Sequence, residues 1–180
     1  MPLAYVQIEE QLAEALPEIQ PAAERYWRAE GPPGADSGPY IFIESMFATY
    51  LAVLLALDPS PTRDNFLRRA FSFVDEMLQS EDREVANLAV VGIFEGRAPW
   101  WWARVRPCLS ACASRQLDRY EPDWRLYATS DEQPTRQEQR EIIDLFGVRW
   151  VIMSALAADG LSPDDVPGVT HTGKYDIRRR

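Results

Sequence analysis

The architecture of this chain is set by the apolar stretch YIFIESMFATYLAVLLAL, residues 40–57. Two sets of large apolar side chains recur in it every four residues, which places each set on one face of a helix. The sets are Met46, Tyr50 and Leu54, and Phe47, Leu51 and Leu55. We therefore expect the central helix of a hydrophobic core. The alternative is a short strand over residues 40–43, which the length of the stretch disfavours.

Two further amphipathic segments follow this helix. A turn at residues 58–62 leads into a helix over about 62–79, and Ser80 is placed to cap a third helix. The apolar faces consist of Phe66, Ala70, Phe73, Val74, Met77 and Leu78, and then Val85, Leu88, Ala89, Val91 and Phe94. Short links between helices favour antiparallel neighbours, so the three helices predict the centre of a bundle.

The flanking sequence also predicts helices. Before the centre we expect helices over 3–16 and 21–29, then a Gly- and Pro-rich loop over 31–39. After it we expect a helix from the tryptophan run at 100–102 to about Cys112, with Pro107 as a possible kink, and another turn or two over 114–121.

The C-terminal part is predicted to be helical with interruptions. Residues 122–134 read as irregular, and the pattern from Thr135 to Glu138 is typical of a capping box that begins a helix. A buried helix is expected over 148–158, and the Pro-, Asp- and Gly-rich residues 161–180 are expected to be loosely held. We predict a single helical domain over 1–160, an all-α antiparallel bundle, with HEAT-like stacked helix pairs as an open alternative.

Composition is that of a globular protein, with 46% hydrophobic and 26% charged residues. No window of about 18 consecutive apolar residues occurs, so we expect no membrane-spanning helix. The N-terminal residues turn acidic at once and lack a basic segment, unlike a signal peptide. A cytoplasmic location is therefore expected.

The net charge of −9 is unevenly distributed. Residues 1–90 contain fifteen Asp and Glu against six Arg, whereas residues 91–180 contain thirteen residues of each sign. An acidic half repels nucleic acids and anionic membranes, and it speeds encounter with basic proteins. Charge alone is equally compatible with a role in solubility.

Residues suited to catalysis are scarce. His171 is the only histidine, and Cys108 and Cys112 are spaced to share one face of a helix as small buried side chains. Acidic pairs such as Glu81 with Glu84, or Glu141 with Asp144, could hold a metal, but helical carboxylates at this spacing are more often a solvated face. We expect no catalytic residues, no metal and no cofactor.

The tryptophan run Trp100, Trp101 and Trp102 allows two interpretations. Three adjacent side chains on a helix point in different directions, so one or two of them are expected in the core and one at a rim. The alternative is an anchor for a protein partner, because Trp and Arg dominate binding hot spots and Arg97, Arg104 and Arg106 lie nearby.

The central segment resembles a family of small bacterial helical proteins that act as immunity proteins or antitoxins beside polymorphic toxins. The resemblance covers residues 38–96, about a third of the chain. It rests on four patterns and Glu95. The patterns are Tyr40-Ile41-Phe42; Phe47-x-x-Tyr50-Leu51-x-x-Leu54-Leu55; Phe71-x-Phe73-Val74-x-Glu76; and Glu81-Asp82-x-Glu84-Val85-x-Asn87-Leu88. The tryptophan run and the residues after it depart from the family.

The resemblance implies a stoichiometric inhibitor of a cognate toxin that acts in the cytosol. A toxin that acts on nucleic acid tends to have a basic cleft, which an acidic helix surface could occupy. Our predicted partner-binding residues are Asp75, Glu76, Glu81, Asp82 and Glu84, followed by Trp100, Trp101 and Trp102 as apolar anchors. A helical adaptor and a carboxylate-based metal enzyme are the alternatives, and the oligomeric state stays open.

Overall fold

The fold is all-α, as predicted. The computed structural model describes residues 2–34, 38–120, 123–127 and 133–145, and within these residues every regular element is a helix. The α-helices are α1 (Ile8–Ala15), α2 (Gln20–Glu30), α3 (Gly38–Phe42), α4 (Thr49–Ala56), α5 (Pro61–Leu78), α6 (Arg83–Ala89), α7 (Pro99–Val105), α8 (Ala111–Tyr120), α9 (Trp124–Tyr127) and α10 (Arg136–Leu145).

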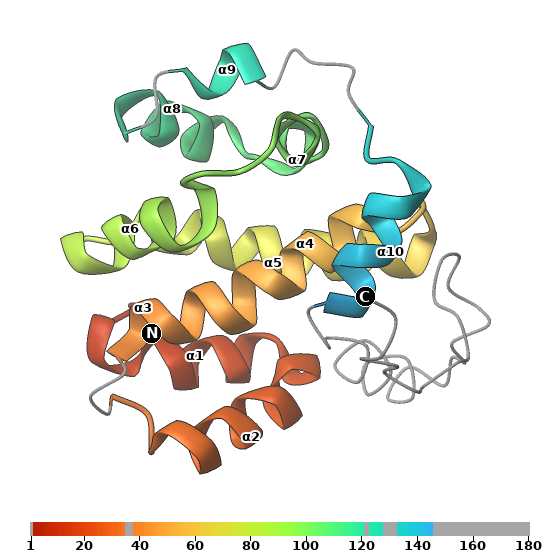
Figure 1. The fold of residues 1–180 in the computed structure, drawn as a ribbon. Coiled ribbons are helices and arrows are strands. Elements are labelled where there is room, and N and C mark those ends of the chain that lie inside the picture. Colours follow the sequence, from red (N-terminus) through yellow and green to blue (C-terminus); the bar gives the residue numbers. More distant parts are fainter. Residues whose placement is uncertain (1, 35–37, 121–122, 128–132, 146–180) are drawn as a thin grey trace.

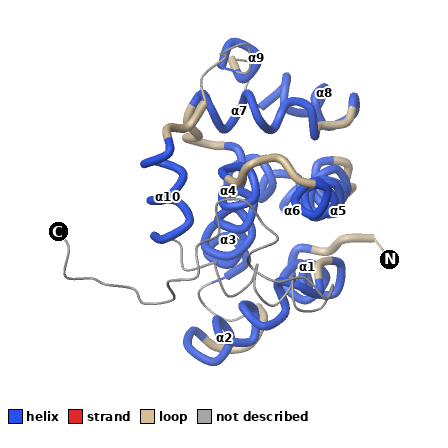
Figure 2. The backbone as a smooth tube through the Cα atoms, turned by 90° about the vertical axis from the view of Figure 1, so that its right-hand side faces the viewer, coloured by secondary structure: helices blue, strands red, loops and turns tan. Residues whose placement is uncertain are grey.

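The helices lie in three layers. In Figure 1, α1 and α2 form the lowest layer, α4, α5 and α6 the middle one, and α7, α8 and α9 the uppermost. A view turned by 90° shows the same order (Figure 2), and α10 packs against α4 at one side. The predicted helical bundle is confirmed.

The central helix is confirmed, and the alternative of a strand over residues 40–43 is wrong. The chain is helical without a break from α3 through a π-helical segment, Ile43–Ala48, to α4. By length and composition Gly38–Ala56 could cross a membrane, but 67% of its apolar window is buried inside the protein. Burial of this kind is typical of the core helix of a bundle.

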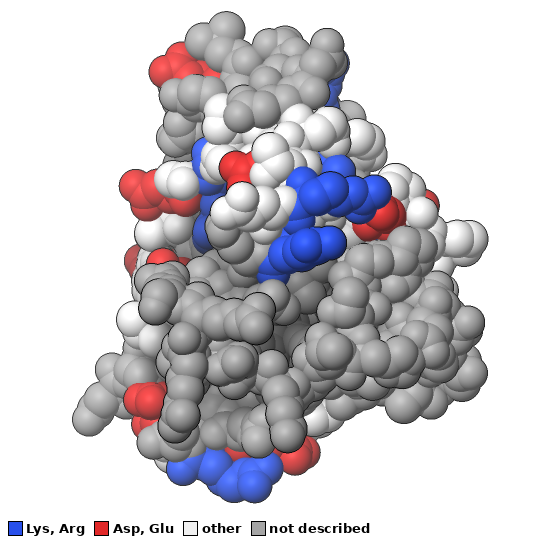
Figure 3. Space-filling view, turned by 45° about the vertical axis from the view of Figure 1, so that its right-hand side comes forward, with Lys and Arg blue, Asp and Glu red and all other residues white. Residues whose placement is uncertain are grey.

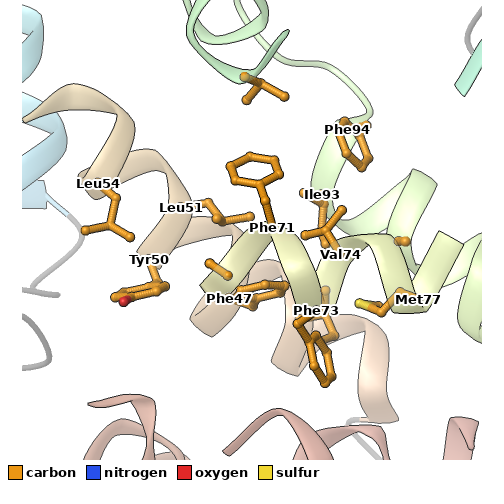
Figure 4. Packing of buried hydrophobic residues seen from close by; sticks show 14 of the residues in the cluster. Phe47, Tyr50, Leu51, Leu54, Phe71, Phe73, Val74, Met77, Ile93 and Phe94 are labelled. Carbon is orange, nitrogen blue, oxygen red and sulfur yellow. The ribbon is translucent and has the colours of Figure 1, made fainter. Parts of the chain in front are cut away.

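The core is formed where α4, α5 and the segment after α6 meet (Figure 4). Phe47 and Phe73 pack edge to face with ring centroids 5.9 Å apart, and Tyr50, Val74 and Met77 are buried around them. Edge-to-face aromatic pairs add about 0.5–1.5 kcal/mol beyond the burial of their area. Apart from Val91, which is 40% exposed, the apolar faces read from the sequence therefore meet as expected.

A second π-helical segment, Val90–Phe94, packs against the first. Gly92 makes this approach possible, because a Cβ atom on it would lie 3.0 Å from Cγ2 of Ile43 and 3.8 Å from Cδ1 of Leu88. Ile43 is fully buried and branched at Cβ, so it has little room to move.

Replacing Gly92 with alanine is expected to lower the free energy of unfolding by about 1–3 kcal/mol, the usual cost of overpacking a core. The gain in helix propensity, about 0.5–1 kcal/mol, offsets part of this cost. Urea denaturation followed by far-UV circular dichroism measures the difference. A Gly92→Ala variant as stable as the wild type would show that the two π-helical segments can separate freely.

The helix boundaries after residue 99 differ from the prediction. Pro107 ends the helix rather than kinking it, because α7 gives way to a 3-10 turn, Arg106–Cys108, and α8 begins at Ala111. Cys108 and Cys112 are half-buried but lie in separate elements, so the prediction that they share a helix face is wrong. Burial raises the pKa of the Cys108 thiol, which suits an unreactive structural role.

The predicted capping box is confirmed. The backbone N–H of Thr135 donates to Oε2 of Glu138 at 2.7 Å, and the N–H of Glu138 donates to Oγ1 of Thr135 at 3.1 Å. The hydrogen bond from the Thr135 backbone, and then one from the Thr135 side chain, lower the pKa of the Glu138 carboxyl. Helix α9 lies inside the stretch predicted to be irregular. The predictions for residues 148–158, residues 161–180 and His171 fall outside the described residues.

Candidate functional site

Three of the acidic residues singled out from the sequence, Glu81, Asp82 and Glu84, lie at the junction of α5 and α6, and we call this junction the acidic turn. The side chains of Glu81 and Glu84 are exposed, and that of Asp82 is partly buried between them. Among the described residues, neither glutamate has an ion-pair partner. The two carboxylates are therefore available to a partner's cations.

Asp82 fixes the conformation of this turn. Its Oδ1 accepts a hydrogen bond from the N–H of Glu84 at 3.0 Å, and its Oδ2 accepts one from the N–H of Tyr5 at 3.0 Å. The prediction that Ser80 caps the helix is wrong: Asp82 is the N-cap of α6, and Ser80 accepts the N–H of Asp82 instead. Asp82 has a structural role, joining the N-terminal segment to the turn.

Removing the Asp82 carboxylate is expected to lower the free energy of unfolding by about 1–2 kcal/mol, because a cap and a second backbone donor lose their acceptor. Asp82→Ala should show this loss, whereas Asp82→Asn should retain most of the stability because asparagine also caps helices. Glu81→Ala is the matched control and should change stability by less than about 0.5 kcal/mol. Equal thermal stability of all three variants would contradict this role.

Asp75 and Glu76 lie on α5, before the turn. Glu76 is exposed and has no ion-pair partner among the described residues. Asp75 is half-buried, and its Oδ1 is a buried acceptor without a hydrogen-bond partner. An acceptor left in this state costs about 1–3 kcal/mol unless a water molecule or a ligand satisfies it. Glu76 is thus the better candidate for direct contact with a partner.

The tryptophan run belongs to the core. Trp100, Trp101 and Trp102 are 8%, 2% and 2% exposed, so none of them offers a ring at the surface. Burial of all three rings disfavours the predicted role as apolar anchors for a partner. Trp102 stacks on Phe94 and meets Trp124 at 5.9 Å, which explains how α7 can bury three adjacent rings: α9 covers its outer side.

Two of the three arginines near this run, Arg97 and Arg104, donate hydrogen bonds to other parts of the protein, whereas Arg106 is exposed. Arg97 donates to the carbonyl oxygens of Ile93 at 2.8 Å and Gly92 at 2.9 Å, closing the end of the second π-helical segment. Burial lowers the pKa of the Arg97 guanidinium. Arg104 donates to the carbonyl of Leu55 at the end of α4 and to Oε1 of Gln133 at 2.9 Å. These contacts give Arg97 and Arg104 structural roles.

Part of the negative charge of the first half is buried. Oε1 of Glu18 accepts from the hydroxyl of Tyr50 at 2.8 Å and from Arg69 at 2.9 Å, and Glu9 accepts from the indole N–H of Trp27 at 2.8 Å. Glu18 and Glu9 are nearly inaccessible to solvent. Glu18 joins the lowest layer to the middle one and Glu9 joins α1 to α2, so the surface charge is carried by the other acidic residues.

The two ends of α5 differ in charge. Near its start, Arg63 donates to the carbonyl of Leu57 at 3.1 Å, and Arg136 pairs with Asp58 at 2.8 Å. Figure 3 shows Arg side chains around the middle and upper part of the face on the side of α10, with a separate group at its lower edge. Since an 18-residue helix is about 27 Å long, this basic region is well separated from the acidic turn at the other end.

The described residues bring together no group of three His, Cys, Asp or Glu side chains suited to hold a metal ion. Of the predicted acidic pairs, Glu81 and Glu84 lie on the exposed turn described above. Glu141 and Asp144 have no described side chains.

Fold and surface together define an all-α domain with an acidic, solvent-exposed interhelical turn. The chain belongs to the family described as "Domain of unknown function (DUF7674)", whose model matches residues 9–110. The match includes the acidic turn and the tryptophan run, and it ends just before α8. Neither a curated protein nor a solved structure matches the chain.

Proposed function

We propose that this protein is an immunity protein, which binds a cognate toxin in the cytosol and neutralises it by forming a stoichiometric complex. The observation that carries the proposal is the set of exposed carboxylates on Glu76, Glu81 and Glu84, none with an ion-pair partner among the described residues. Exposed carboxylates without an ion-pair partner attract a basic protein surface and speed its association.

Rigidity of the turn adds to this support. Asp82 ties the turn both to α6 and to the N-terminal segment, so little ordering is required when a partner binds. Low ordering cost favours affinity, because binding otherwise has to offset lost side-chain and loop freedom. The partner that this surface fits is a toxin with a basic substrate cleft, in agreement with the resemblance over residues 38–96.

Co-expression tests the proposal. The chain is produced together with the large protein encoded immediately upstream, and growth and co-purification are scored in the same cells. Rescue of growth together with a stable complex is expected. A harmless neighbour that still co-purifies would favour a helical adaptor instead, and a harmless neighbour that forms no complex would rule out immunity against that protein.

A further inference from the structure

The large hydrophobic side chains exposed within the described residues are Val6, Ile41 and Val91, with 73%, 49% and 40% of their surface accessible. Val6 lies before α1, Ile41 on α3 and Val91 in the second π-helical segment. Val91 was expected on a buried helix face. Scattered exposed apolar residues are ordinary, so the question is whether these three share one surface.

Two contacts bring these segments together. The rings of Tyr5 and Tyr40 lie 6.1 Å apart, and Nδ2 of Asn87 donates a hydrogen bond to the hydroxyl of Tyr40. Val6 follows Tyr5, Ile41 follows Tyr40, and Val91 lies about one helical turn after Asn87. We give the name tyrosine patch to the residues in these contacts together with the exposed apolar residues next to them or one turn away, namely Tyr5, Val6, Tyr40, Ile41, Asn87 and Val91.

Carboxylates border the tyrosine patch. Glu84 lies one turn before Asn87 and Glu44 one turn after Tyr40, and both side chains are exposed. Burial, then Tyr40 and the carboxylates of Glu84 and Glu9, raise the pKa of the Tyr5 hydroxyl, in keeping with the position of Glu84 one turn before Asn87. The bond from Asp82 to the Tyr5 N–H joins the patch to the acidic turn.

Positive charge near the patch is limited. Arg83 is exposed on α6. The guanidinium of Arg97, which interacts electrostatically with Glu44, donates its hydrogen bonds to backbone carbonyl oxygens. A second copy of this chain would oppose carboxylates to carboxylates, so self-association through the patch is disfavoured. The described residues also contain no sheet edge to which a strand could be added.

We propose that the tyrosine patch docks a basic amphipathic helix of the protein partner, whose apolar side chains cover Val6, Ile41 and Val91 while its Lys or Arg side chains pair with Glu44 and Glu84. This inference rests on the proposed function and names the segment of the toxin that the surface recognises. In helix docking the apolar anchors of the ligand helix cover exposed apolar side chains of the receptor, and its charged side chains pair with charges at the rim. The tyrosine patch supplies the apolar side chains, and Glu44 and Glu84 supply the charges.

A synthetic 18-residue peptide of Leu and Lys, with Leu at helical spacing on one face, provides the first test. Its binding to the full-length protein is measured by calorimetry, and its position by chemical-shift changes in ¹⁵N-labelled protein. We expect the shifts to centre on the tyrosine patch and binding to weaken about tenfold or more in Ile41→Ser/Val91→Ser. Shifts centred elsewhere would overturn the proposal.

Matched charge variants separate docking from unspecific attraction. Glu44→Gln/Glu84→Gln should weaken binding, whereas Glu14→Gln/Glu30→Gln, which removes two exposed carboxylates from α1 and α2, should not. Equal weakening of peptide binding by both charge variants would overturn the proposal. The proposal would also be overturned if the peptide bound Ile41→Ser/Val91→Ser as tightly as the wild type.

Growth rescue separates this inference from the proposed function. Failure of the wild type to rescue growth counts against the immunity function. The peptide measurements alone then test whether the tyrosine patch docks a basic helix. Rescue by the wild type and equally tight toxin binding by Ile41→Ser/Val91→Ser would leave the function standing and overturn the docking role of the patch.

Discussion

Replacing Trp102 with alanine is expected to lower the free energy of unfolding by about 3–5 kcal/mol, the cost of removing a large aromatic side chain from a packed core. Trp102 is 2% exposed and touches three other rings, with centroids 5.5 Å from Phe94, 5.2 Å from Trp101 and 5.9 Å from Trp124. Loss of the ring leaves a cavity between α7 and α9, and α9 loses its main aromatic contact with α7.

Urea denaturation followed by far-UV circular dichroism measures this loss, since removing a tryptophan would itself alter fluorescence. Val91→Ala is a suitable control, because Val91 is 40% exposed and its truncation should change stability by no more than about 0.5 kcal/mol. A loss below about 1 kcal/mol for Trp102→Ala would mean that the tryptophan cluster does not hold the upper layer to the core.

Reversing the charge of Glu76, Glu81 and Glu84 is expected to weaken toxin binding by about a hundredfold or more, through a slower association rate and unpaired contacts. All three side chains are exposed, so Glu76→Lys/Glu81→Lys/Glu84→Lys should fold normally. Asp82 is left unchanged because it caps α6 and binds the Tyr5 N–H. Stopped-flow association rates and equilibrium affinities at two salt concentrations measure the effect.

The control for charge reversal is Glu14→Lys/Glu24→Lys/Glu30→Lys, which makes the same change in net charge on exposed positions of α1 and α2. It should reduce the association rate much less, because its charges lie away from the acidic turn. A folded variant at the turn that binds as tightly as the wild type would remove the turn from the binding surface. Equal weakening by both triple variants would show that only net charge matters.

Much of the fold is predictable from local patterns. The four-residue spacing around Tyr50 and the amphipathic pattern of α5 predict helices that the structure contains, and the capping box at Thr135 begins α10 as expected. These signals are local, because each depends on contacts within a few residues of the chain. The π-helical segments carry no such signal, since they depend on how Gly92 meets Ile43 across the core.

The candidate site was only partly predictable for the same reason. The acidic turn is visible in the sequence, but the role of Asp82 depends on Tyr5, which lies 77 residues away. Burial of all three tryptophans depends on Trp124, and exposure of Val91 depends on which side of its helix meets the core. Tertiary partners decide these features, and a pattern of charges or aromatic residues does not identify the partners.

Stoichiometric neutralisation can be measured directly by titrating the purified protein against the purified product of the adjacent upstream gene, with the toxic activity of that product as the readout. Immunity by complex formation predicts that activity falls linearly and disappears at a ratio of one to one, with a complex of the same ratio on gel filtration. Undiminished activity in the presence of a large excess of this protein, with both proteins folded, would contradict it.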